Sequence, residues 1–120
     1  MTKTQERLQT DTQMMERLSQ IAKTIDELKG QETVVLNVQE FLIPTSYMVI
    51  TSANNSKQLR GMREAVEHCL DIKAINYEGQ DSKQWTVVDF GSIIVHVMSE
   101  EARSFYELDE LWEGNTVELS

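Results

Sequence analysis

The sequence has little of what several classes of protein depend on. Its 120 residues include a single cysteine, Cys69, which excludes an internal disulfide and a zinc site built from several cysteines. No apolar run approaches the roughly 20 residues that a membrane-spanning helix needs, and the polar segment 1–12 lacks the apolar stretch of a secretory signal. These absences predict a soluble, cytoplasmic protein that does not associate with a membrane.

Basic residues are also scarce, with 11 lysines and arginines against 20 aspartates and glutamates and a formal net charge of −9. The excess is uneven, since residues 78–120 carry 10 acidic residues and only two basic ones, Lys83 and Arg103. Contacts with nucleic-acid phosphates need clustered lysine and arginine side chains. The composition therefore argues against direct, sequence-specific binding of nucleic acid.

Glycine and histidine are too few for most catalytic signatures. The five glycines form neither of the glycine-rich loops that hold nucleotide phosphates. His68 falls beside glutamates on a predicted helix, and His96 has no serine or cysteine nucleophile motif near it. The many carboxylates follow no metal-binding loop pattern. We therefore expect no catalytic residue, cofactor or metal, with an anion site at the polar turn Ser52–Ser56 as the alternative.

A single proline, Pro44, and no tract rich in glycine, serine or proline indicate one domain over residues 1–120. The first eleven residues lack hydrophobic periodicity and are predicted to be a mobile lead-in. Residues 113–120 follow the last predicted helix and are expected to be a mobile tail with no assigned role.

Hydrophobic spacing predicts three helices and five strands. The helices are expected near residues 12–29, from a cap at Asn55 to Cys69, and from a cap at Ser99 through Phe105, Tyr106 and Leu108 to Leu111 and Trp112. The strands are expected at Thr33–Val38, Tyr47–Thr51, Ala74–Tyr77, Trp85–Phe90 and Ile93–Met98. This order predicts an α/β (α+β) fold, in which helices pack against a mixed β-sheet of about five strands.

The last two strands flank Gly91 and Ser92 and are predicted to form a β-hairpin. Because strand side chains alternate between faces and directly paired residues share a face, the hairpin residues divide into two sets. One set is apolar apart from a threonine, as the face of a hydrophobic core requires: Thr86, Val88, Phe90, Ile93, Val95 and Val97. The other set mixes apolar and polar side chains: Trp85, Val87, Asp89, Ile94, His96 and Met98.

This mixed set suits neither a hydrophobic core, which should not hold Asp89 and His96, nor a solvated face, which should be mostly polar. A tryptophan anchor, aliphatic neighbours and a flexible methionine are typical of a protein-interaction surface. The alternative is that another helix, such as the first, covers the set and leaves the two polar residues at its edge. The pattern alone leaves both possibilities open.

Longer segments of the sequence resemble a known family. The segment Trp85–Met98 and the segments Glu101–Tyr106 and Leu108–Trp112 that follow it are similar to the ribosome silencing factor family, also called Iojap-like. Upstream, Val35–Val38 and Ser46–Gln58 resemble a strand and a strand–turn–helix segment of the same family. The resemblance extends from residue 13 to residue 112, so the tail is expected to lie past the family's usual ending.

The resemblance implies a mixed α/β fold similar to that of nucleotidyltransferases, and a protein that binds the large ribosomal subunit through its ribosomal protein fourteen. Occupying that surface blocks joining of the small subunit and represses translation when nutrients are scarce. The Gly-Ser and paired-aspartate signature of nucleotidyltransferases is absent, so we expect a protein that is not an enzyme, with a nucleotide-binding enzyme as the alternative. A weak homodimer through the same surface is a further possibility.

The family's hairpin tryptophan, which is implicated in docking on the ribosomal protein, corresponds to Trp85. This residue is also the aromatic anchor of the mixed set. We therefore predict a partner-binding surface where apolar residues bury area and acidic residues pair with basic side chains of the partner. It consists of Trp85, Asp89, Ile94, His96, Met98, Glu100 and Glu101.

Overall fold

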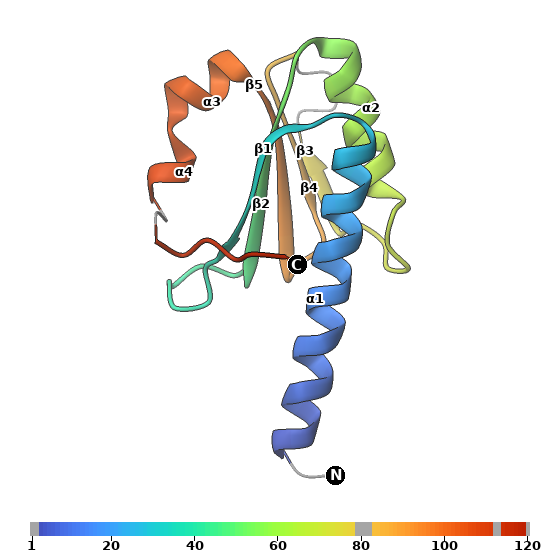
Figure 1. The fold of residues 1–120 in the computed structure, drawn as a ribbon, viewed down its shortest axis with the longest axis vertical. Helices are drawn as coiled ribbons and strands as arrows, with labels where there is room; N and C mark the ends of the chain where they lie inside the picture. The colour runs from blue at the N-terminus through green and yellow to red at the C-terminus, as the bar shows by residue number, and fades with distance from the viewer. Residues whose placement is uncertain (1–2, 79–82, 112–113, 120) are drawn as a thin grey trace.

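The chain forms four helices and five strands over the residues that the structure describes. The computed structural model describes the backbone of residues 3–78, 83–111 and 114–119, and the side chains of 12–75, 83–108, 110 and 114–119. The elements (Figure 1) are α1 Lys3–Glu27, β1 Gln31–Asn37, β2 Tyr47–Ala53, α2 Ser56–Glu67, β3 Asn76–Glu78, β4 Trp85–Asp89, β5 Ile93–Ser99, α3 Glu100–Tyr106 and α4 Leu108–Leu111. None of the described helices is both long and apolar enough to cross a membrane.

The five strands form one mixed sheet in the order β1-β2-β5-β4-β3. Strands β2 and β5 run parallel, whereas the other neighbouring pairs run antiparallel. A parallel pair needs a crossover connection, and α2 lies within the connection between β2 and β5. The predicted α/β fold with a mixed sheet and helices packed against it is therefore confirmed.

The first helix is longer than the hydrophobic pattern predicts. It begins at Lys3 rather than near residue 12, so the helix includes most of the predicted lead-in. Residues 3–29 contain neither proline nor glycine, so no residue there stops the helix from extending past its buried stripe. Ile21 and Ile25 lie in that stripe and are fully buried, while the N-terminal turns project away from the sheet in Figure 1.

The chain turns from α1 into β1 through Lys29 and Gly30. Lys29 adopts the left-handed conformation with φ 64°, and the Gly30 amide donates to the Ile25 carbonyl at 2.9 Å. A Cβ atom on Gly30 would lie 2.7 Å from the Thr51 hydroxyl oxygen, which is closer than packing permits. The glycine therefore allows α1 to end against β2.

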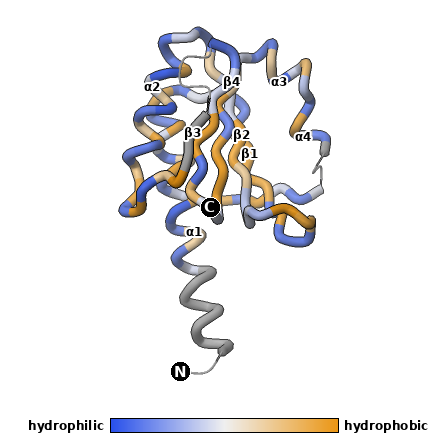
Figure 2. The backbone as a smooth tube through the Cα atoms, turned by 180° about the vertical axis from the view of Figure 1, so that it is seen from behind, coloured by the Kyte–Doolittle hydropathy of each residue, from blue (hydrophilic) through white to orange (hydrophobic). Residues whose placement is uncertain are grey.

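Helices α1 and α2 cover one face of the sheet (Figure 1). The apolar set predicted for the hairpin lies on this face, and all six of its members are buried: Thr86, Val88, Phe90, Ile93, Val95 and Val97. The five apolar members pack with apolar residues of both helices in the larger core cluster. Figure 2 shows the same organisation, because the most hydrophobic stretches of the chain gather in the central strands. The prediction for this face is confirmed.

The opposite face is covered only in part, by α3 and by the loop of residues 38–46. A second, smaller cluster is buried there and consists of Leu36, Val38, Ile50, Met98 and Ala102. Partly buried residues border it: Val34, Phe41, Ile43, Met48, Trp85 and Leu108. The helices over this face are short, with seven residues in α3 and four in α4. Part of the sheet surface therefore stays open between them and the hairpin.

The C-terminal segment returns along the outer edge of β1. The Asn37 amide donates to the Asn115 carbonyl at 2.9 Å, and the Val117 amide donates to the Val35 carbonyl at 2.7 Å. Residues 115–119, which belong to the predicted tail, thus lie along β1 in the structure. An edge strand offers unpaired backbone groups, and this segment satisfies some of them.

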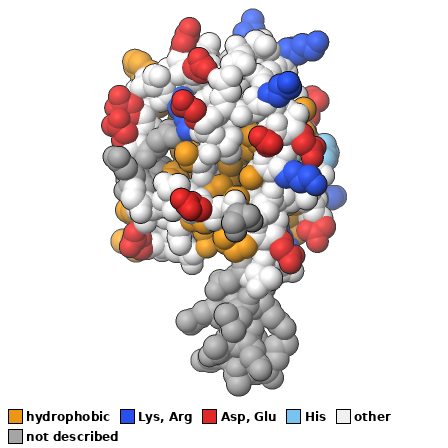
Figure 3. All heavy atoms as spheres, in the orientation of Figure 1, with side chains coloured by type: hydrophobic (Ala, Val, Ile, Leu, Met, Phe, Trp, Pro, Cys, Tyr) orange, Lys and Arg blue, Asp and Glu red, His pale blue; other side chains and the backbone are white. Residues whose placement is uncertain are grey.

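A groove of about 590 Å³ lies between α1, β1 and this C-terminal segment, with Val35, Val117 and Leu119 among its lining residues. Figure 3 shows hydrophobic side chains gathered in a hollow near the middle of this side of the molecule. The groove marks where the segment lies over the edge of the first core cluster, to which Val117 and Leu119 belong as partly buried members.

The predicted final helix is divided in two. Glu107 adopts the left-handed conformation with φ 49°, and its amide donates to the Arg103 carbonyl at 3.0 Å, which ends α3 before α4 begins. Both predicted helix caps are present, since Asn55 accepts from the Gln58 amide at 2.8 Å and Ser99 accepts from the Ala102 amide at 3.1 Å. Trp112, the predicted end of this helix, lies outside the described residues.

Candidate partner-binding surface

The hairpin register brings the mixed set together on one face. Strands β4 and β5 pair Trp85 with Met98, Val87 with His96 and Asp89 with Ile94. Directly paired residues share a face of an antiparallel ladder. The prediction that these six residues share one face is therefore confirmed. Strand β2 continues the face, because Met48 lies beside Ile94.

Burial on this face is greatest where the C-terminal half of β5 meets α3. Met98 is fully buried and His96 is 9% exposed, whereas Trp85, Asp89 and Ile94 are only partly buried. The covering element is α3, which follows β5 directly and packs Ala102 into the same cluster as Met98. The face is thus neither fully open nor covered by the first helix. Met98 and His96 support the surface from beneath, which corrects their predicted place on it.

An aromatic cluster lies beside Met98, at the end of the face where α3 begins. The Trp85 ring lies 4.9 Å from the Tyr106 ring, and the Tyr106 ring lies 5.0 Å from the Phe105 ring, measured between centroids. Phe105 is 80% exposed and Tyr106 is 53% exposed. Sequence reasoning counted both as apolar positions of a helix rather than as surface residues. The signal that could have found them is that adjacent helix residues point about 100° apart, so one narrow buried stripe does not take both Phe105 and Tyr106.

The Trp85 indole is fixed by His96. Its Nε1 donates to His96 Nδ1 at 3.0 Å, and the two rings lie 5.8 Å apart. Burial lowers the pKa of the His96 imidazole from 6.5 to about 4, so the ring is neutral at neutral pH. Because Nδ1 accepts, the proton of the neutral ring lies on Nε2, a buried atom with no hydrogen-bond partner among the described residues. A histidine in this setting orients the tryptophan and is poorly suited to act as a general base.

Asp89 has a local task in the hairpin turn. Its Oδ1 accepts from the Gly91 amide at 2.7 Å, and Gly91 has the positive φ of 88° that favours glycine. One carboxylate oxygen is therefore engaged in the turn, while the residue as a whole is partly exposed. Asp89 can contribute negative charge to the surface, but its position is set by the turn.

The other predicted acidic residues lie at the opposite end of β5. Glu100 and Glu101 are exposed in the first turn of α3, where the helix dipole favours negative charge. Ser99, which precedes Glu100, donates its amide to the Gln84 carbonyl at 2.8 Å. Because Gln84 precedes Trp85, the two glutamates lie near the Trp85 end of the hairpin. The structure thus places the two glutamates at one margin of the hairpin face and Asp89 at the other.

The polar turn after β2 is accounted for by helix capping. Besides the Asn55 cap, the Gln58 side chain accepts from the Asn54 amide at 2.6 Å and donates to the Leu28 carbonyl at 2.9 Å. A hollow of about 350 Å³ adjoins the turn, and Glu100 and Glu101 line it together with Lys83. Two carboxylates beside this turn disfavour an anion, the ligand considered for Ser52–Ser56.

The described part of the chain contains no group of three or more histidine, cysteine, aspartate or glutamate side chains placed to hold a metal ion. Cys69 is half-buried, and burial raises the pKa of its thiol. A raised pKa lowers the fraction of reactive thiolate at neutral pH. The thiol therefore packs as a small side chain, as its position in the helical pattern indicates.

Comparison with known proteins assigns a family to this arrangement. The family described as "Ribosomal silencing factor during starvation" matches residues 11–120. This match includes the C-terminal segment, so the expectation that the tail lies past the family's usual ending is wrong.

Individual relatives agree with this match. The chain is 29% identical over 110 residues to the ribosomal silencing factor of Halalkalibacterium halodurans, covering 87% of this chain and 92% of the relative. It is 33% identical over 95 residues to the ribosomal silencing factor of Haemophilus influenzae, covering 77% and 93%. A crystal structure of a Chromobacterium violaceum protein superposes with a TM-score of 0.79 at 22% identity, covering 88% and 90%. The chain belongs to the ribosomal silencing factor family.

Proposed function

We propose that this protein binds the large ribosomal subunit through ribosomal protein fourteen and thereby blocks joining of the small subunit, which represses translation under nutrient limitation. Cytoplasmic ribosomes are the proposed target. The observation that carries the proposal is the partly exposed Trp85, fixed by His96 beneath it and by Tyr106 beside it. A large aromatic side chain held in one orientation loses little conformational entropy on binding, as interface hot spots require.

The surroundings of Trp85 suit a basic protein partner. Ile94 and Met48 lie side by side at the other end of the same face and offer partly buried apolar area. Glu100 and Glu101 place negative charge at one margin, and Asp89 places it at the other. An apolar centre with an acidic margin complements a partner whose contact surface carries lysine and arginine. The same charge repels the phosphate backbone of ribosomal RNA, so we expect the contact to be made with protein.

The proposal is tested by sedimenting the protein with purified large and small ribosomal subunits in separate experiments. We expect the protein to pellet with the large subunit and not with the small one. Trp85→Glu should weaken this binding at least about thirtyfold, since an interface hot spot contributes roughly 2 kcal/mol or more. Binding should also weaken as salt rises, because charge pairs at the margin of an interface are screened.

The matched control is Leu28→Glu, which makes the same change of charge on a 38% exposed apolar residue in the turn that follows α1. Circular dichroism establishes that both variants fold. Equal binding by folded Trp85→Glu, Leu28→Glu and unchanged protein would refute the assignment of this surface. Equal pelleting with both subunits would refute the proposed steric block.

A second copy of the chain is another candidate partner for the same surface. Two copies of a partly apolar face can pack against each other about a two-fold axis. Sedimentation velocity over a range of concentrations measures this association. If the dimer uses the hairpin face, Trp85→Glu should abolish it, and the dimer should compete with binding to the large subunit.

A further inference from the structure

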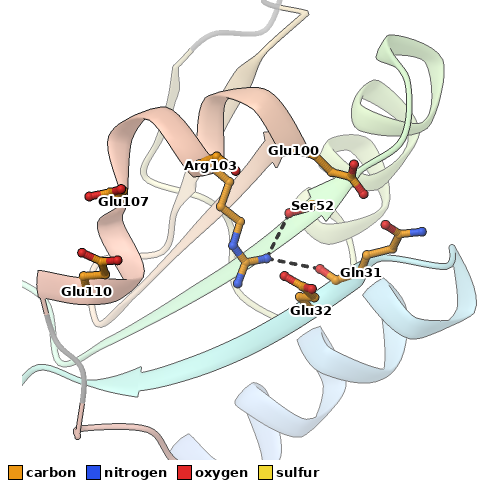
Figure 4. Close-up of a pocket in the computed structure, with 8 residues that line it drawn as sticks. Gln31, Glu32, Ser52, Glu100, Arg103, Glu107 and Glu110 are labelled. Atoms are coloured by element: carbon orange, nitrogen blue, oxygen red, sulfur yellow. Dashed lines mark hydrogen bonds between the residues drawn. The ribbon is translucent and has the colours of Figure 1, made fainter.

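Arg103 is a buried cation whose place in the binding surface is not evident from its sequence position. It lies on α3 and is 9% exposed, which is unusual for a charged residue on a seven-residue helix at the surface. Its Nη1 donates to the Ser52 hydroxyl at 3.0 Å and to the Gln31 carbonyl at 3.2 Å (Figure 4). A buried guanidinium is tolerated only where such acceptors are provided.

The acceptors are provided by an irregularity in the edge strand. The register of β1 against β2 shifts between Gln31 and Val34, and Glu32 within the shift has a φ of 48°. Such a bulge interrupts the regular ladder of backbone hydrogen bonds. The Gln31 carbonyl is left to accept from the Arg103 guanidinium and, at 3.4 Å, from the Thr51 hydroxyl. One guanidinium thus joins α3 to both β1 and β2.

Four carboxylates keep the surroundings of the guanidinium negative. Glu32, Glu100, Glu107 and Glu110 line a hollow of about 530 Å³ into which Arg103 extends, as Figure 4 shows. They favour the charged guanidinium in this partly desolvated place. The hollow and the arginine therefore form one electrostatic unit between α3, α4 and the bulge of β1.

Arg103 lies one helical turn before Tyr106. Residues three apart on a helix lie on neighbouring parts of its surface, so the position of the guanidinium fixes how Tyr106 is presented. Tyr106 is the last residue of α3, and the helix is closed by the Glu107 amide donating to the carbonyl of Arg103 itself. The ring of Tyr106 in turn lies against Trp85.

We propose that Arg103 is a positioning residue of the partner-binding surface. Its guanidinium holds α3 on the bulge of β1 and on the end of β2, so that Tyr106 keeps Trp85 in the orientation that a partner meets. The inference rests on the proposed function only for the assignment of Trp85 to a partner-binding surface. The link from Arg103 to Trp85 concerns packing within the chain and is tested without a partner. Both bonds are donated by the single Nη1 group. Lysine keeps the charge, but its ammonium is a compact and more strongly hydrated group, so we expect it to replace the guanidinium only in part.

The test follows the environment of the Trp85 indole directly. Trp112→Phe is introduced into every protein so that Trp85 is the single tryptophan. In this background Arg103→Met should raise the acrylamide quenching constant of Trp85 about twofold and weaken large-subunit binding about tenfold, because the charge-assisted hydrogen bonds that hold α3 to the sheet are lost. Arg103→Lys should restore the charge and only part of both properties. Ser52→Ala, which removes one acceptor, should give an intermediate effect.

The matched control is Ser104→Ala, because Ser104 is an exposed neighbour that lines the same hollow. It should change neither quenching nor binding. Unchanged Trp85 quenching in folded Arg103→Met overturns the inference, whatever happens to binding. If Arg103→Met does not fold, unchanged quenching in both Arg103→Lys and Ser52→Ala overturns it equally.

The two proposals fail in different ways. Altered quenching together with no large-subunit binding by the unchanged protein supports the link from Arg103 to Trp85 and refutes the proposed function. Loss of binding in Trp85→Glu together with unaltered quenching in the Arg103 variants supports the proposed function and refutes the link.

Discussion

The two faces of the β4–β5 hairpin are built from neighbouring residues of the same strands, yet they meet very different surroundings. Ile93, Val95 and Val97 point toward α1 and α2 and are fully buried. Ile94 lies between two of them, on the opposite face, and is only partly buried. Side-chain chemistry therefore does not by itself separate a core face from a partly exposed face.

The difference comes from the length of the covering elements. Helix α1 has 25 residues and α2 has 12, so together they extend across the first face. Helix α3 has seven residues and reaches only the end of the second face, where Met98 and Ala102 meet. The remainder of the second face stays partly exposed because no element of the described chain is long enough to cover it fully.

Substituting the two adjacent isoleucines of β5 tests the comparison most severely. Ile93→Ala should lower the free energy of unfolding by about 2–5 kcal/mol, because it leaves a cavity in a fully packed core. Ile94→Ala removes the same atoms from a partly exposed site and should cost about 1 kcal/mol. Urea unfolding followed by far-UV circular dichroism measures both values. Equal losses would show that the second face is packed as tightly as the first.

Acid should destabilise the protein through the second face. The folded protein holds His96 neutral down to a pKa of about 4, whereas the unfolded chain takes up the proton near pH 6.5. Since the unfolded state binds more protons in this window, stability falls as pH drops from 6.5 toward 4. The expected loss from this residue is about 3 kcal/mol, at roughly 1.4 kcal/mol per pH unit.

Comparing unfolding free energies at pH 7 and pH 4.5 isolates this effect. His96→Gln should remove it, because glutamine does not titrate and can still accept from the Trp85 indole. His68→Gln changes an exposed histidine on the other side of the sheet and should retain the His96 contribution. A pH dependence that persists unchanged in His96→Gln would contradict the assigned neutral state.

The C-terminal segment extends the comparison to the edges of the sheet. Removing residues 115–120 deletes two backbone hydrogen bonds to β1 and the partly buried Val117 and Leu119. We expect a loss of about 2 kcal/mol in unfolding free energy. The exposed edge of β1 should also promote self-association, which sedimentation velocity detects. Glu118→Ala, at an exposed position of the same segment, should leave both properties unchanged.

The hairpin could be predicted because the residues that determine it lie close together in the sequence. Alternation sorted its residues correctly into two faces, and the caps at Asn55 and Ser99 followed from residue type and spacing. These features depend on residues within a few positions of one another. The mixed sheet likewise followed from the order of helices and strands.

Long-range features were not predictable in the same way. The return of residues 115–119 to β1 depends on an edge strand about 80 positions earlier in the chain, which no local pattern signals. The bulge that receives Arg103 depends on a left-handed Glu32, a residue type without a preference for that conformation. Burial of Met98 depends on α3 folding back over its own strand, and this direction is set by tertiary packing.

Asp89 provides the smallest and most specific test, because it joins the hairpin turn to the surface charge. Its carboxylate accepts from the Gly91 amide, and an asparagine oxygen can accept the same bond. Asp89→Asn should therefore change the unfolding free energy by less than about 0.5 kcal/mol, whereas Asp89→Ala should cost about 1 kcal/mol by leaving the amide without its partner.

Binding of the same two variants to the large subunit separates the charge of Asp89 from its role in shaping the turn. If negative charge at this margin matters, Asp89→Asn should weaken binding at low salt and match the unchanged protein at high salt, where screening removes the advantage of the carboxylate. If Asp89→Asn binds normally at every salt concentration while Asp89→Ala does not, the residue serves the surface only by shaping the turn.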